Sequence, residues 1–60
     1  MTVFVNDKRV DLLPGMTVRH ALTQAGLLKS LEAGKRVYDE WGNEMGLDGA
    51  TYEDMKILVR

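Results

Sequence analysis

Few residues of this 60-residue chain could take part in chemistry. The chain has no cysteine, which excludes a thiol nucleophile, a disulfide and a thiolate metal site. His20 is the only histidine, and no second histidine or cysteine is available to complete a metal site. So small a domain is also not expected to enclose a pocket of about 300 Å³ or more. We therefore interpret His20 as a surface residue, predict no catalytic residue, metal or cofactor, and expect that the protein is not an enzyme.

Acidic side chains concentrate in the second half of the chain. Residues 39–54 contain six of the nine acids and none of the eight bases, although the net charge is only −1. Such a stretch could recognise a basic partner surface, but a solvated loop face is the more common explanation. The spacing does not fit a calcium-binding EF-hand loop, and the charge disfavours nucleic-acid binding. The six acids are Asp39, Glu40, Glu44, Asp48, Glu53 and Asp54.

Two strand-like segments carry the candidate binding residues. "MTVFV" at the start and "MKILVR" at the end alternate with period 2, which is typical of strands with one buried side. If these strands are neighbours, Phe4 and Leu58 both point away from the core, beside Lys56 and Arg60. An apolar patch with a basic rim is typical of a protein-docking surface, whereas isolated apolar residues are ordinary on any surface.

Trp41, the only tryptophan, is the remaining candidate. It lies beside Gly42-Asn43, at the tip of a predicted hairpin. An exposed tryptophan would mark a binding spot, because aromatic anchors dominate interface energetics. We favour the other interpretation, in which Trp41 folds back over the sheet edge and Leu27 or Leu28. The predicted partner-binding residues are Phe4, Lys56, Leu58, Arg60 and Trp41.

The elements that must position these residues begin with a hairpin and a helix. Residues 1–12 form two alternating runs separated by the turn-forming "NDK", with Val3, Val5 and Val10 among the inward side chains. After Pro14-Gly15, Thr17 is a good N-cap, and apolar residues recur at helical spacing over 18–25 until Gly26 can cap the helix. His20 falls on the solvent face of this helix.

The second half is expected to be mostly strand and turn. Residues 27–34 could extend the helix, form a second short turn or pack irregularly, and a break at Gly26 is favoured because an internal glycine costs about 1 kcal/mol. "KRVYDE" is a strand candidate, "MGL" a possible brief return strand, and Met55, Ile57 and Val59 face inward from the last strand.

This order of elements predicts one domain over residues 1–60. A single helix and a few short strands bury a common core only if the helix lies across one face of a single sheet. We expect an α+β fold of the β-grasp type, with a four- to five-stranded mixed sheet, one main helix packed on one face, and the last strand beside the first.

The opening "MTVFVNDKRVDLLPGMTVRHAL" resembles the ubiquitin-like β-grasp proteins, most closely the ThiS/MoaD-type sulfur carriers. In that family a strand, a turn, a second strand, a "PG-x-T-V" segment and an "A-L" helix follow in this order. The match is good over residues 1–26 and holds in pattern over 35–60. TGS domains and plant-type ferredoxin scaffolds share the same opening, but the cysteine ligands of a ferredoxin are absent.

The resemblance implies a carrier whose terminal Gly-Gly is adenylated and converted to a thiocarboxylate, but this sequence ends at Arg60. We therefore expect a non-catalytic interaction module that docks on a larger partner enzyme. The alternatives are a sulfur carrier of thiamine or molybdopterin biosynthesis whose tail is absent from this chain, and a subdomain of a longer protein. No apolar stretch is long enough for a membrane span and no leader is evident, so a cytoplasmic location is expected.

Overall fold

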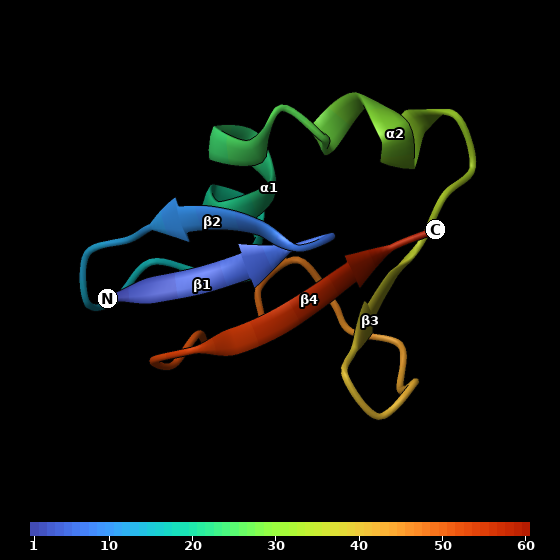
Figure 1. Cartoon of the computed structure of the whole chain (residues 1–60). Coiled ribbons are helices and arrows are strands. Elements are labelled where there is room, and N and C mark those ends of the chain that lie inside the picture. Colours follow the sequence, from blue (N-terminus) through green and yellow to red (C-terminus); the bar gives the residue numbers. More distant parts are fainter.

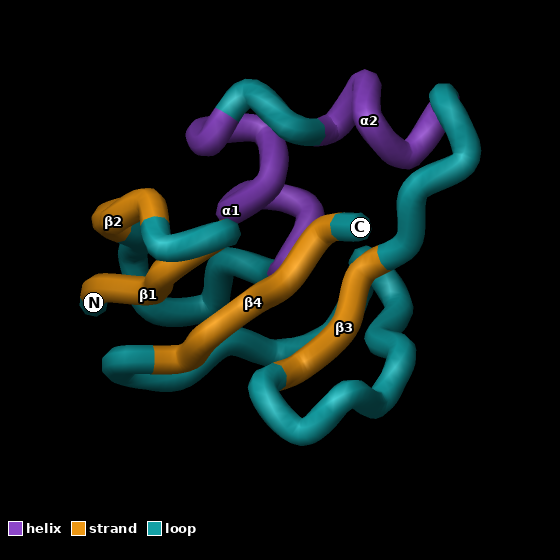
Figure 2. Tube along the Cα trace, turned by 45° about the vertical axis from the view of Figure 1, so that its right-hand side comes forward, coloured by secondary structure: helices purple, strands orange, loops and turns teal.

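The computed structural model of the chain describes residues 1–60 as one four-stranded sheet with two helices. Both helices lie on the same side of the sheet (Figures 1 and 2). The strand order is β2-β1-β4-β3, with β1 and β4 parallel and the other two pairs antiparallel. The α+β class and the mixed sheet are therefore confirmed. The elements are β1 (Thr2–Val5), β2 (Lys8–Asp11), α1 (Val18–Ala25), α2 (Leu28–Glu32), β3 (Val37–Asp39) and β4 (Met55–Val59).

The hairpin of β1 and β2 is closed by a two-residue turn. Asn6 and Asp7 both have positive φ, at 49° and 68°. Positive φ at both central residues is the type I′ geometry, whose twist matches that of the flanking strands. Asn and Asp tolerate this conformation better than other residues with a side chain. The turn predicted from "NDK" is thus present, and it sets the register in which Val5 lies opposite Lys8.

Helix α1 begins and ends where its sequence predicts. The N–H of Thr17 donates to Nδ1 of His20 at 3.0 Å, so His20 takes the place that Glu or Gln has in a common capping box. Gly26 ends the helix with φ of 74°, and Leu27 N–H donates to the Leu22 carbonyl at 2.9 Å. His20 is exposed, as expected, but its role in the cap was not foreseen.

For two segments, residues 27–34 and 45–47, the sequence left alternatives that the structure decides. Of the alternatives for residues 27–34, the second short turn is correct, and it forms the helix α2 after the break at Gly26. The brief return strand expected at "MGL" does not form. Glu44, just before it, makes only an isolated bridge with Tyr38. The sheet therefore has four strands, the lower number of the expected four to five, and one main helix is followed by a shorter one.

The core lies between the sheet and α1. It contains the inward side chains of every strand and the apolar stripe of α1, while Leu27, Leu28 and Leu31 pack partly buried at its margin. The alternation in the first and last strands is confirmed, because Val3, Val5, Ile57 and Val59 are all buried. Neither helix is long and apolar enough to cross a membrane. The core residues are Val3, Val5, Val10, Leu12, Val18, Ala21, Leu22, Ala25, Val37, Met55, Ile57 and Val59.

The two edges of the sheet are formed by β2 and β3, so the last strand has no free edge. The outer edge of β3 is covered by the segment that follows it. Met45 N–H donates to the Val37 carbonyl at 2.8 Å, and Asp39 N–H donates to the Asn43 carbonyl at 2.9 Å. These bonds satisfy outward groups of β3, whereas no element lies along the outer edge of β2 (Figure 2).

Candidate functional site

The side of the sheet that faces away from both helices is left open, and we call it the open face. Strand register decides which side chains share it. Phe4 lies between Arg9 of β2 and Lys56 of β4, and Tyr38 of β3 lies opposite Leu58. Each of the five has at least one strand neighbour that is buried in the core, so alternation directs all five side chains to the open face.

A depression of about 280 Å³ on the open face brings several of these side chains together. Phe4 and Leu58 are half-buried in it, and Lys56 is exposed beside them. The predicted residues Phe4, Lys56 and Leu58 therefore form one cluster, because the first and last strands pair in parallel. The lining residues are Phe4, Asp7, Glu40, Lys56, Ile57 and Leu58.

Arg60 also lies on the open face, where it contacts Tyr38. Its guanidinium lies over the Tyr38 ring, 4.9 Å from the ring centroid, in cation–π geometry. Arg60 and Arg36 exchange backbone hydrogen bonds of 2.9 and 3.0 Å, which continue the β3–β4 ladder by one pair. Tyr38 was not among the predicted site residues. The alternation of Val37, Tyr38 and Asp39 is the sequence signal that could have placed Tyr38 on the open face.

Trp41 does not line this depression, and the favoured interpretation of its position is wrong. Its residue surface is 71% exposed, so it does not fold back over the sheet edge. Leu27 and Leu28, its expected contacts, pack against the core. Trp41 instead lies in an exposed turn after β3.

The carboxylate of Asp39 organises the turn that carries Trp41. Oδ1 of Asp39 accepts the N–H of Trp41 at 2.9 Å and that of Asn43 at 2.8 Å, and Oδ2 accepts from Nδ2 of Asn43 at 3.2 Å. Gly42 has φ of 87°, which closes the turn. These hydrogen bonds to the charged form, first of all the one from the Asn43 backbone, hold the pKa of Asp39 below its ordinary value.

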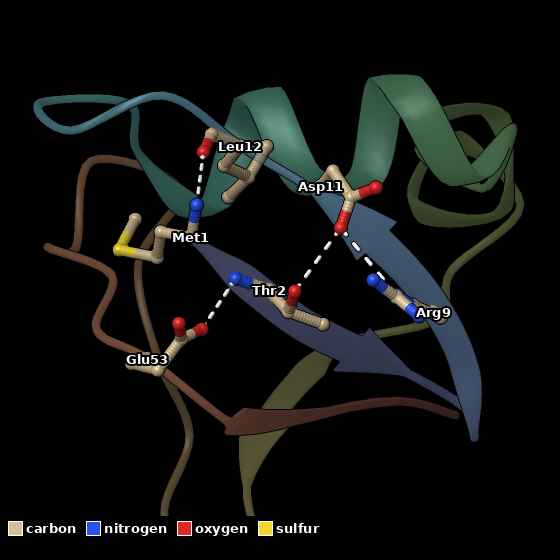
Figure 3. Close-up of polar contacts among 6 residues, drawn as sticks. All are labelled: Met1, Thr2, Arg9, Asp11, Leu12 and Glu53. Carbon is tan, nitrogen blue, oxygen red and sulfur yellow. Dashed lines mark hydrogen bonds and ion pairs between the residues drawn. The ribbon is translucent and has the colours of Figure 1, made fainter.

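The other acids of residues 39–54 make separate local contacts. Glu44 pairs with Arg36 at 3.0 Å, which raises the pKa of Arg36, and Asp48 lies 3.9 Å from Arg19. Glu53 accepts the backbone N–H of Thr2 (Figure 3). Four of the six acids, counting Asp39, thus have partners within the chain. These separate contacts favour the interpretation of the acidic residues 39–54 as a solvated loop face over their interpretation as one recognition patch.

A second depression, of about 380 Å³, lies between α2, residues 34–37 and residues 44–47. Its walls include the apolar Leu31, Val37, Met45 and Leu47 and the paired Arg36 and Glu44. We expected no enclosed pocket of about 300 Å³ or more in so small a domain. This depression has a larger volume, but it is open to solvent. No group of three or more His, Cys, Asp or Glu side chains is placed to hold a metal ion.

The open face therefore carries four of the five residues that the sequence predicted to bind a partner, namely Phe4, Lys56, Leu58 and Arg60. It carries half-buried apolar side chains beside exposed basic ones on hydrogen-bonded strands. No family model matches the chain, and no curated protein or solved structure matches it.

Proposed function

We propose that the chain is a β-grasp-like, non-catalytic interaction module that binds a larger partner enzyme through its open face. The strand order β2-β1-β4-β3, with a parallel central pair and both helices on one side, is compatible with a β-grasp arrangement. The observation that carries the proposal is the cluster of Phe4, Leu58 and Tyr38 on the side of the sheet that no helix covers.

The apolar part of this cluster provides the driving force for docking. Phe4 and Leu58 are only half-buried in the free chain, so a partner can remove their remaining surface from water. Burial of apolar surface contributes about 25 cal/mol per Å² before the costs of association are subtracted. Because the cluster lies on hydrogen-bonded strands rather than on a loop, little backbone order has to be gained on binding.

The charged part of the open face predicts the chemistry of the partner. Arg9 and Lys56 flank Phe4, and Arg60 lies over Tyr38, whereas the acidic Asp7 and Glu40 line the same depression as Phe4 and Leu58. A partner surface with an apolar protrusion and acidic residues around it would complement this arrangement. We expect association to slow as salt concentration rises, since exposed charges are screened.

A photocrosslinking experiment in the native host tests the proposal. A benzoylphenylalanine residue at position 58 reports on the open face, and the same residue at position 13 is the matched control, because Leu13 is 67% exposed but precedes α1 in a loop. We expect one larger protein to crosslink from position 58 and not from position 13.

Competition then establishes whether the crosslink reports specific docking. Unlabelled wild-type chain and the Leu13→Ser variant should both suppress the crosslink, whereas the Phe4→Ser, Leu58→Ser double variant should not. Equal competition by all three chains, or crosslinks of equal yield from both positions, would show that the open face is not the docking surface.

A further inference from the structure

The outer edge of β2 presents backbone groups that nothing in the chain satisfies. The Met1 ammonium donates to the Leu12 carbonyl at 2.9 Å (Figure 3), and the Leu12 N–H donates to the Met1 carbonyl at 2.7 Å, so this pair is hydrogen-bonded. Hydrogen-bonded and non-hydrogen-bonded pairs alternate along an antiparallel ladder. The Thr2–Asp11 and Phe4–Arg9 pairs are therefore of the second kind. The N–H and C=O groups of Arg9 and Asp11 consequently point away from β1, towards the free edge.

The side chains of these two residues lie together on the open face. Nε of Arg9 is 3.5 Å from Oδ1 of Asp11, and the same carboxylate oxygen accepts the hydroxyl of Thr2 at 3.1 Å (Figure 3). Both charged side chains remain exposed. The edge thus alternates a positive and a negative residue at the two positions where its backbone can accept another strand.

This alternation is self-complementary in one register only. When the β2 strand of a second copy pairs antiparallel, its outward N–H and C=O groups must lie opposite those of the first copy. Since only Arg9 and Asp11 carry such groups, three alignments are possible. Arg9 opposite Arg9, or Asp11 opposite Asp11, sets like charges against each other, which destabilises a strand pair. Arg9 opposite Asp11 of the second copy gives two attractive pairs, related by symmetry, and places Val10 opposite the Val10 of that copy.

We propose that β2 is a homodimerisation edge, on which a second copy of this chain adds its own β2 antiparallel with Arg9 opposite Asp11. Each of the two symmetry-related pairs then supplies two backbone hydrogen bonds and one ion pair. The contact is isologous, meaning that both chains use the same edge, so a dimer leaves no β2 edge free for a third chain. Because Met45 and Asn43 cover the β3 edge, the resulting sheet has no second free edge on which to grow.

The dimer would also change the surface offered to a partner. A two-fold axis perpendicular to a continuous sheet keeps the helices of both copies on one side. The two open faces then lie side by side on the other. The inference goes beyond the proposed docking function and does not depend on it. Arg9 contributes to both surfaces, but Asp11→Arg alters the edge without changing a residue of the proposed docking surface, and Leu58→Ser alters that surface without changing the edge.

Charge reversal tests the register directly. So short a ladder predicts a weak dimer, with a Kd of roughly 0.1–1 mM, measurable by sedimentation equilibrium up to about 2 mM chain. Arg9→Asp makes all four facing side chains acidic and Asp11→Arg makes them all basic, so each variant should raise the Kd at least about tenfold. An equimolar mixture of the two variants should form a heterodimer at least as tight as the wild-type dimer, because every facing pair is again of opposite charge.

Matched controls separate the edge from general effects of charge and folding. Arg19→Asp on α1 makes the same change in net charge on the other side of the sheet and should dimerise like the wild type. Circular dichroism should show all variants folded, since the pair of Arg9 and Asp11 is exposed. In the wild type, the Arg9 and Asp11 amides should gain protection from hydrogen exchange as concentration rises, while the amide of Glu40 does not.

Three results would overturn the proposal. The first is a wild-type chain that stays monomeric up to about 2 mM, a concentration above the Kd range of so short a ladder. The second is a dimer that Arg9→Asp leaves unchanged but Phe4→Ser abolishes, because the open face would then be the contact. The third is a failure of the mixed variants to associate although each remains folded.

Discussion

The side chain of Asn6 forms two hydrogen bonds with the backbone of Val59, a residue far along the chain. The N–H of Val59 donates to Oδ1 of Asn6 at 2.9 Å, and Nδ2 of Asn6 donates to the Val59 carbonyl at 3.1 Å. Asn6 has φ of 49°, outside the strand region, yet its backbone N–H still donates to the Ile57 carbonyl at 2.9 Å. Its side-chain amide then extends the pairing between the first and last strands by one more residue, Val59.

Replacing Asn6 by glycine should remove these two bonds and leave the turn intact. Glycine adopts positive φ readily, so the loss isolates the side-chain contribution. We expect Asn6→Gly to lower the free energy of unfolding by about 1–2 kcal/mol, measured by urea denaturation. Asp7→Gly is the control, since it creates an Asn-Gly type I′ turn and should be neutral or stabilise by about 0.5 kcal/mol. Equal losses in both variants would assign the effect to the turn.

Truncating Leu22 should severely weaken the fold. Leu22 is fully buried and is among the largest such side chains in the core. Leu22→Ala should cost about 2–5 kcal/mol, and a domain of this size has a total stability of only roughly 3–9 kcal/mol. Leu13→Ala, at an exposed position, should stay within about 0.5 kcal/mol of the wild type. Chemical denaturation of both variants checks this, and a folded Leu22→Ala chain of unchanged stability would contradict the core assignment.

Substitutions of His20 test whether its side chain caps the N-terminus of α1. Nδ1 of His20 accepts the N–H of Thr17 and lies 3.1 Å from the Thr17 hydroxyl. His20→Ala should therefore destabilise the protein by about 0.5–1 kcal/mol, measured by thermal unfolding. His20→Glu should recover most of the loss, since Glu at this position completes the usual capping box and suits the helix N-terminus. If Glu and Ala behave alike, the imidazole does not act as a cap.

Protonation of Asp39 should open the turn that carries Trp41. Because the pKa of Asp39 is lowered in the folded chain, its contribution to stability is fully present above the ordinary value of 3.8. That contribution is lost as the pH falls through the lower folded-state pKa. NMR titration should show the amides of Trp41 and Asn43 responding together in this acid range. Asp39→Asn should abolish the response, and Glu40→Gln should retain it.

Features that depend on residues a few positions apart could be predicted from the sequence. Alternation in the first and last strands identified Val3, Val5, Ile57 and Val59 as inward residues, because the direction of a strand side chain depends only on its parity. Thr17 and Gly26 marked the ends of α1 for a similar reason, since caps satisfy backbone groups within one helical turn.

Contacts between distant segments could not be predicted in the same way, because they depend on how the strands are ordered in the sheet. The sequence does not show that Arg60 stacks on Tyr38 or that Asn6 bonds Val59, because each contact needs a particular strand order and register. The prediction for Trp41 was wrong because hydrogen bonds to Asp39 form the turn that carries it, and in this turn Trp41 is exposed. The free edge of β2 likewise follows from the insertion of β4 between β1 and β3, which is a property of the whole sheet rather than of any local run of residues.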